Sequence, residues 1–105
     1  MSFDLTPDPA KSYSELEIHH RTPQVILVEE GRVLVPVAKE FGTDCVEFVP
    51  LSAGEAMVIS PEVWHFGPTA SGANSRIIVA FRQGTPKHDL EKRTLPTPVT
   101  LPQPS

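Results

Sequence analysis

The sequence has few features that would let it bind nucleic acid or cross a membrane. Its 105 residues carry nine Lys and Arg against thirteen Asp and Glu, and the cations form no block. Nucleic-acid binding draws its affinity from clustered cations that face phosphates. No apolar run approaches the roughly 20 residues of a membrane-spanning helix, and no secretory signal is visible at the N-terminus. We therefore expect a cytoplasmic protein without nucleic-acid or membrane partners.

Cysteine is also scarce, and so are long segments without proline or glycine. The chain has one cysteine, Cys45, so no internal disulfide can form and packing alone must hold the fold. Nothing near Cys45 marks a reactive thiol, and we predict that it is a small core residue. Twelve prolines and six glycines leave little room for long helices. A chain of this length supports one hydrophobic core, which predicts a single domain.

What the chain does have is a series of short apolar runs rich in valine and isoleucine, separated by turn signals. The runs cover residues 15–20, 24–29, 33–38, 46–49, 56–59 and 76–82. Strands of this length and spacing are typical of an all-β sandwich or barrel. We predict a barrel or sandwich of roughly six to nine strands over residues 14–93. Residues 1–13 would form an N-terminal arm or edge extension, and residues 94–105 a proline-rich tail.

Three local features refine this prediction. Residues 29–32 read as a hairpin in which Gly31 takes a positive φ. Pro36 cannot donate a ladder hydrogen bond, which predicts that its strand lies at an edge or carries a bulge. Residues 89–93 could form one short helical turn before the tail.

The polar residues within the apolar runs are the candidates for chemistry. Alternation puts Glu17 and His19 on one face of their strand, opposite Leu16 and Ile18. Two open interpretations follow if these two side chains share a cavity with a second imidazole and an amide. The set could hold a divalent first-row metal with free positions for substrate. It could equally transfer protons without a metal.

The candidate site residues divide by role. We predict His65 and Glu17 as catalytic groups, and Trp64, Gln24 and Arg82 as substrate-binding residues, with Arg82 as a carboxylate anchor. The predicted metal ligands are Glu17, His19, Gln24 and His65.

The stretch from residue 17 to 31 resembles the first motif of the cupin superfamily. That motif has two histidines one residue apart, then a glutamate, six residues and a glycine. Gln24, six residues and Gly31 reproduce its last part, with glutamine in place of glutamate. His19 or His20 takes the place of a motif histidine, whereas the partner position is not histidine.

Residues 54–65 resemble the second cupin motif, which has a glycine, an apolar strand, a proline turn and a histidine. Gly54, residues 56–59, Pro61 and His65 follow this order. The resemblance implies a cupin fold, the double-stranded β-helix. In such a barrel one sheet face lines the interior, while the other can be covered by a partner subunit. We therefore expect a homodimer.

Within the cupins, the chain is most similar to the ureidoglycolate lyase family. Residues 15–19, Glu-Leu-Glu-Ile-His, match a segment of that family, and residues 63–65, Val-Trp-His, match another. Arg82-Gln83-Gly84 resembles its turn after the last barrel strand. The resemblance implies an enzyme that acts on a small polar acid and releases urea and glyoxylate from ureidoglycolate, with Mn, Ni, Zn or Fe as the expected metal.

Two alternatives remain open at this point. One is a different metal-dependent cupin enzyme, such as an isomerase or an oxygenase. The other is a non-enzymatic module that binds a small molecule or a protein, which the glutamine at position 24 and the absent second motif histidine favour.

Overall fold

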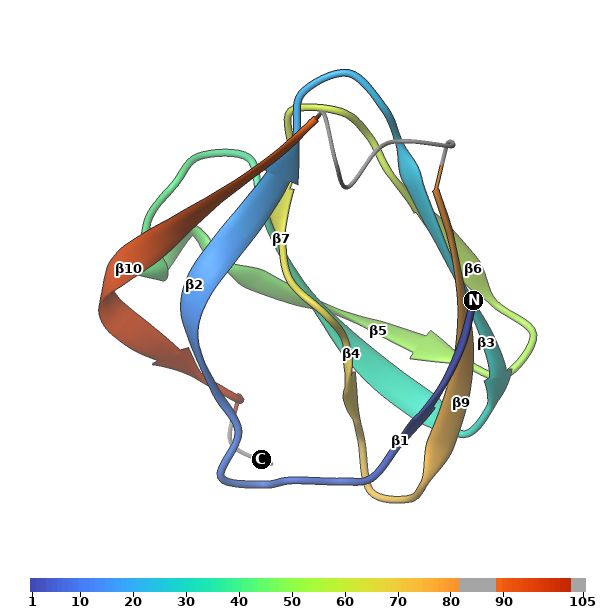
Figure 1. Ribbon diagram of the computed structural model, residues 1–105. Helices are drawn as coiled ribbons and strands as arrows, with labels where there is room; N and C mark the ends of the chain where they lie inside the picture. The colour runs from blue at the N-terminus through green and yellow to red at the C-terminus, as the bar shows by residue number, and fades with distance from the viewer. Residues whose placement is uncertain (82–88, 103–105) are drawn as a thin grey trace.

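The computed structural model describes residues 1–81 and 89–102, which form two antiparallel β-sheets that face each other (Figure 1). The smaller sheet has the strand order β1-β9-β3-β6, and the larger has the order β10-β2-β7-β4-β5 with β8 also paired to β4. The strands are β1 (Ser2–Leu5), β2 (Ser12–His19), β3 (Gln24–Glu30), β4 (Arg32–Ala38), β5 (Glu47–Ser52), β6 (Ala56–Ile59), β7 (Trp64–His65), β8 (Thr69–Ala70), β9 (Ser75–Phe81) and β10 (Leu90–Thr100). The predicted all-β fold is confirmed.

Two separate apolar layers hold these sheets. The inner core fills the space between the sheets and consists of Ile26, Val28, Val33, Val35, Leu51, Ile59, Ile77 and Val79. An outer cluster covers the other face of the larger sheet and consists of Leu16, Ile18, Ala38, Trp64, Leu95 and Val99. Burial of each such side chain contributes about 1.5–3 kcal/mol. Strands β2, β4 and β7 therefore have a covered face on both sides.

The turn at Gly31 does not close a hairpin, so that local prediction was wrong. Strand β3 belongs to the smaller sheet and β4 to the larger, so the turn carries the chain from one sheet to the other. Gly31 has the expected positive φ of 79°. A Cβ atom added there would lie 2.4 Å from Ser75 Oγ, and that hydroxyl donates to Arg32 O and accepts from Arg32 N.

Pro36 lies in a central strand rather than at an edge, because β4 pairs with β5 on one side and with β7 and β8 on the other. Strand β7 pairs with residues 37–38 of β4, and β8 pairs with residues 33–34. The partner on that side is therefore interrupted opposite Pro36, where a proline costs no ladder bond. The segment between β7 and β8, residues 66–68, is held by a hydrogen bond that the Tyr13 hydroxyl donates to Gly67 O at 2.8 Å.

Both terminal segments contribute strands. Residues 2–5 pair with β9, and residues 90–100 run along β2 with a register shift between Thr94 and Val99. The helical turn predicted at residues 89–93 was therefore wrong, since most of that segment begins β10. Among the described residues, no helix has the length and apolar character that a membrane crossing requires.

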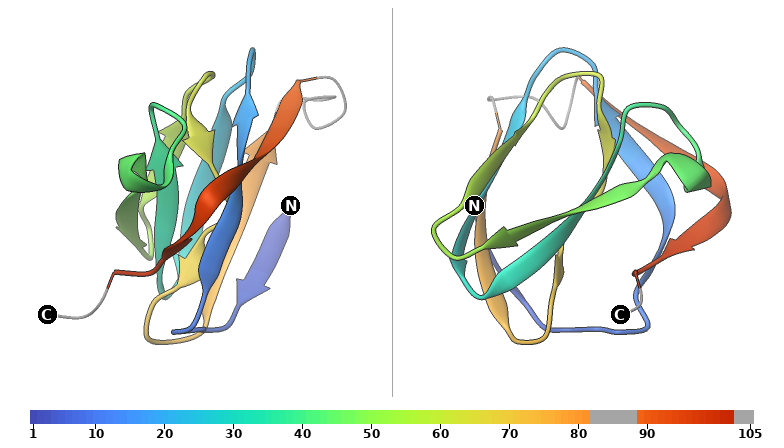
Figure 2. Two further views of the ribbon diagram at one scale, coloured as in Figure 1. Left: turned by 90° about the vertical axis from the view of Figure 1, so that its left-hand side faces the viewer. Right: turned by 180° about the vertical axis from the view of Figure 1, so that it is seen from behind.

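Cys45 is exposed, which corrects its predicted place in the core. It ends a short 3₁₀ turn, η1 (Thr43–Cys45), which buries none of its residues and lies beside β10 (Figure 2).

Gly31 offers a test of this topology. We expect Gly31→Ala to lower the free energy of unfolding by about 3 kcal/mol, because it adds overlap with Ser75 to the cost of a positive φ. Gly72→Ala is the matched control, since Gly72 has φ 83° but open space at its Cβ position, and it should cost only about 1 kcal/mol. Urea unfolding measures both. Equal losses in the two variants would contradict the close approach at Gly31.

Candidate metal centre

The candidate site forms where three strand ends meet. His19 is the last residue of β2, Gln24 is the first residue of β3, and His65 is the second residue of β7. The loops that join these strands, residues 20–23 and 60–63, lie at the same end of the barrel (Figure 1). The strand ends therefore carry their polar side chains to one place, although the residues are far apart in sequence.

Pairing between strands fixes the faces of these side chains. Glu17 on β2 lies directly opposite His65 on β7, so both point to the same side of the sheet. Glu17 Oε1 lies 3.6 Å from His65 Nε2. The imidazole rings of His19 and His65 stack with centroids 5.0 Å apart. One ligand atom from each of these three residues lies within 4.8 Å of the others, so the strands bring three of the four predicted metal ligands together.

The hydrogen bonds of His65 define its protonation. Its Nδ1 lies 3.0 Å from the carbonyl oxygen of Val63, which can only accept, so Nδ1 carries the hydrogen. In the neutral ring Nε2 therefore presents a lone pair, and this atom lies 3.1 Å from Gln24 Oε1. Two lone pairs at this distance repel each other. The contact becomes favourable when the Gln24 amide turns its NH₂ group toward Nε2, or when a cation lies beside both atoms.

Burial shifts the pKa values of the three residues. Desolvation raises the pKa of Glu17, against the opposing effects of His19 and Lys92. Desolvation lowers the pKa of His65. It also lowers the pKa of His19, together with the charge of His65. The imidazoles are thus held neutral, the form in which histidine binds a metal.

The donor set fits a divalent first-row metal. Two imidazoles and one carboxylate are the set that holds non-haem Fe(II) with open positions. Two ligands at about 2.1 Å from one ion lie about 3.0 Å apart at right angles and about 3.4 Å apart at the tetrahedral angle. His65 Nε2 lies 3.1 Å from Gln24 Oε1 and 3.6 Å from Glu17 Oε1. In such a site Val63 O would orient His65 through its Nδ1–H, as outer-shell acceptors do.

Two acidic residues hold the loops beside the site, one through its carboxylate and one through its backbone. Asp89 Oδ2 accepts hydrogen bonds from the Arg21 and Thr22 backbone N–H groups, both at 3.0 Å, and from Thr22 Oγ1 at 2.7 Å. Glu62, at a positive φ of 68°, donates its backbone N–H to His19 O at 2.8 Å. These bonds fix the loop between His19 and Gln24 and the turn that precedes His65.

The remaining predicted residues lie elsewhere. Trp64 is not a pocket residue: it belongs to the outer cluster, because it precedes His65 in the strand and so points to the opposite face. Its ring packs against Phe41 with centroids 4.8 Å apart. Arg82, the predicted carboxylate anchor, lies outside the described residues.

Sequence reasoning missed two features near the site. A cavity of about 470 Å³ is lined by Val37, which pairs with His65, and by Val63, but by none of the four predicted metal ligands. Lys92 on β10 pairs with Glu17 and so reaches the same face of the sheet. Alternation along residues 90–93 could have revealed Lys92 had that segment been interpreted as a strand.

Comparison with known proteins gives the fold a name. No protein-family model matches the chain, and no curated protein matches its sequence. Among solved structures, an oxalate oxidase aligns with TM-score 0.60 and 20% identity over 90% of this chain and 44% of its own. Hydroxypropylphosphonic acid epoxidase from S. wedmorenis aligns with TM-score 0.54 and 22% identity, covering 74% and 40%. Drosophila melanogaster CENP-C bound to CAL1 aligns with TM-score 0.58 and 16% identity, covering 77% and 59%.

These likenesses establish the cupin fold that the two motifs predicted. The chain spans about half the length of the solved structures that it matches, from 40% to 59% in these three.

The pKa shifts predict opposite behaviour for two histidines in the metal-free protein. His65 should titrate below its ordinary value of 6.5, since burial lowers its pKa. The exposed His20 should titrate above 6.5, because hydrogen bonds from its ring to Glu91 and Glu62 raise its pKa. NMR titration of the imidazole carbons measures both, with assignment by a His→Gln substitution at each histidine.

The lowered pKa of His65 determines how the stability of the fold changes with pH. The unfolded chain takes up a proton at about 6.5, whereas the folded chain resists it. The stability that neutral His65 contributes is therefore present above pH 6.5 and is lost as the pH falls below that value. A His65 resonance that titrates at or above 6.5 would contradict the buried, neutral ring.

Proposed function

We propose that this chain is a metal-dependent cupin enzyme that acts on a small polar acid. The observation that carries the proposal is the convergence of Glu17, His19 and His65 within 4.8 Å on the inner face of the larger sheet. Two of the aligned structures are described as Fe(II) and Co(II) forms of the epoxidase, and the same kind of ion suits these donors. Gln24 would supply a fourth, neutral oxygen ligand.

Charge supports an acid as the substrate. The four side chains carry one negative charge when the imidazoles are neutral, so a divalent ion would leave the site with a net positive charge. A carboxylate is attracted to such a site, which has low dielectric surroundings because His19 and His65 are buried. A bound ion would act as a Lewis acid toward a substrate oxygen.

The finer proposal is the ureidoglycolate lyase reaction, and the sequence matches at residues 15–19 and 63–65 support it. Glu17 would accept the proton of the substrate hydroxyl through the carboxylate oxygen that does not hold the ion. The C–N bond then breaks, and its electron pair goes to the nitrogen while the C–O bond becomes a carbonyl. Glu17 returns the proton to that nitrogen, so the products are urea and glyoxylate.

A protein-binding module is the second candidate function, favoured by the alignment with CENP-C bound to CAL1. It predicts no dependence of binding on the residues Glu17 and His65. A different metal-dependent reaction, such as an isomerisation or oxygenation, would use the same ligands on another substrate.

Two further proposals concern the setting of the protein. We place it in the cytoplasm and infer that it forms a homodimer. The outer side of the smaller sheet supports a dimer, because Val58 is 60% exposed there and lies opposite the half-buried Val25. Sedimentation equilibrium measures the mass of the assembly.

Metal binding tests the class of function. We expect the purified protein to bind one equivalent of Co²⁺, followed by its visible absorption. Glu17→Gln should weaken binding by at least about 100-fold, beyond the 10–100-fold typical of outer-shell changes. Glu15→Gln, two residues earlier on the same strand, is the matched control and should leave the affinity within about threefold. A wild-type protein that binds no Co²⁺ would overturn the proposed metal centre.

Turnover tests the finer reaction. We expect glyoxylate release from ureidoglycolate by protein loaded with Mn²⁺, Ni²⁺ or Zn²⁺, and loss of release in His65→Ala, because that variant lacks a predicted ligand. Circular dichroism confirms that the variant remains folded. No release above background with any metal, from protein that binds Co²⁺, would remove the lyase and leave another metal-dependent reaction.

A further inference from the structure

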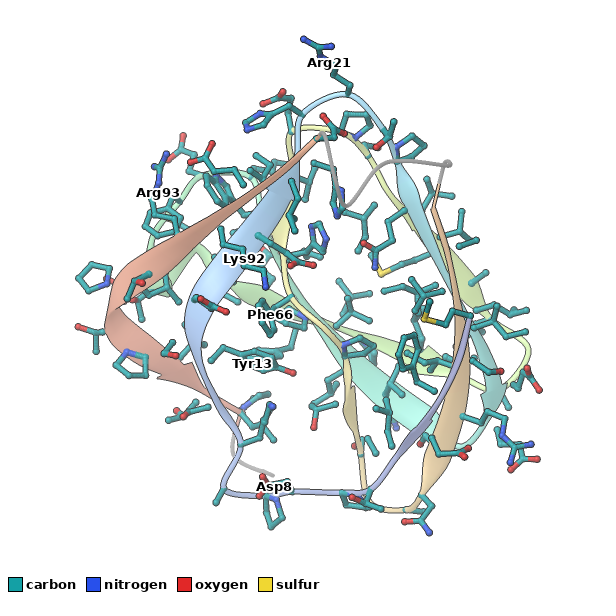
Figure 3. All side chains as sticks on the ribbon, in the orientation of Figure 1. Asp8, Tyr13, Arg21, Phe66, Lys92 and Arg93 are labelled. Carbon is teal, nitrogen blue, oxygen red and sulfur yellow. The ribbon has the colours of Figure 1, made fainter. Side chains whose placement is uncertain are left out.

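Five side chains from adjacent strands form one row across the inner face of the larger sheet. The row consists of Lys92, Glu17, His65, Val37 and Glu47. Residues that lie directly opposite each other on antiparallel strands point to the same face. Lys92 therefore shares a face with the candidate metal centre, one strand away from Glu17. In Figure 3 the Lys92 side chain extends from β10 across β2, whereas Arg93 points away from the interior.

Lys92 differs from Glu91 and Arg93, its neighbours on β10, because no ion pair accounts for its charge in the described part of the chain. Glu91 and Arg93 point to the opposite face, where Glu91 accepts from His20 at 2.9 Å and Arg93 lies 5.0 Å from the Trp64 ring centre. Within residues 1–81 and 89–102, no carboxylate forms an ion pair with Lys92. Its charge nevertheless reaches Glu17, the anionic residue of the candidate centre.

The opposite end of the row is acidic. Glu47 lines the cavity of about 470 Å³ beside Val37, together with Glu40 and Lys39. The two carboxylates outweigh the single lysine there, so an anionic group would be repelled from this end. A small acid that enters the site would be favoured with its carboxylate toward β10 and its neutral end toward β5.

We propose that Lys92 binds the carboxylate of the substrate and so selects small acids over their neutral counterparts, an inference that rests on the proposed function. The ammonium supplies charge-assisted hydrogen bonds to a carboxylate, which are stronger than those to a neutral amide. Lys92 contacts the substrate and not the ion, so it sets the class of substrate without holding the metal.

The test is calorimetric titration of Co²⁺-loaded protein with glycolate and with its neutral analogue glycolamide. We expect the wild type to prefer glycolate by at least tenfold. Lys92→Met should lose at least tenfold in glycolate affinity, with glycolamide affinity within threefold of the wild type. Lys92→Arg should keep most of the preference. Lys11→Met is the matched control and should change neither affinity, because Lys11 lies over the Tyr13 ring and away from the row.

The outcomes separate this inference from the proposed function. Absence of Co²⁺ binding in the wild type would overturn both. Co²⁺ binding with no preference for glycolate, or with equal preference in Lys92→Met, would overturn the role of Lys92 and leave the metal centre standing. Loss of the preference in Arg82→Met, the cation that the sequence predicts as the anchor, but not in Lys92→Met, would overturn the role of Lys92. Because Lys92 is exposed on β10, its substitution should leave the thermal unfolding temperature unchanged.

Discussion

The candidate site depends on how the two-residue strand β7 is held between β2 and β4. So short a strand makes few ladder bonds, and its position is set by the residue that it buries on the outer side. Trp64 is 7% exposed and packs against Phe41 and beneath Arg93. A buried tryptophan of this size outweighs the few hydrogen bonds of the strand. With Trp64 fixed outside, alternation aims His65 inward at Glu17. Trp64 thus serves the site from the opposite face of the sheet.

The chemistry of the site is a consequence of placing polar side chains in a dry interior. Glu17, His19 and His65 sit among apolar neighbours, where burial disfavours the charged form of each. Such a cluster costs the fold stability, since its lone pairs face one another with little water to solvate them. A divalent cation offsets that cost by pairing with the lone pairs directly. The arrangement is therefore a poor structural core and a good ligand set, in which Glu17 supplies the carboxylate because the usual motif glutamate is Gln24.

The sequence predicted those parts of the fold that depend on local alternation. The shared face of Glu17 and His19 and the all-β class both follow from the period of two along short apolar runs. Alternation does not say which face is inner when both are covered, as they are in β7, and so Trp64 was assigned to the pocket. A glycine with positive φ serves a hairpin and a crossing between sheets equally well, and only the pairing of β3 and β4 with other strands distinguishes them. Cys45 was assigned to the core from its residue type, whereas its exposure follows from the short turn between β4 and β5.

Strand β10 both covers the outer cluster and carries a side chain that faces the candidate site. Its outer side chains, Leu95 and Val99, are 4% and 8% exposed and cover Leu16 and Ile18 from solvent. Its inner side chain, Lys92, faces Glu17 across one strand spacing. Residues 90–94 pair with β2 in one register, which places Lys92 opposite Glu17 and Arg93 opposite Leu16, and the register shifts before Val99. A shift of one residue along this first part of β10 would exchange the two faces. The pairing of residues 90–94 with β2 therefore determines that Lys92, and not Arg93, shares a face with Glu17.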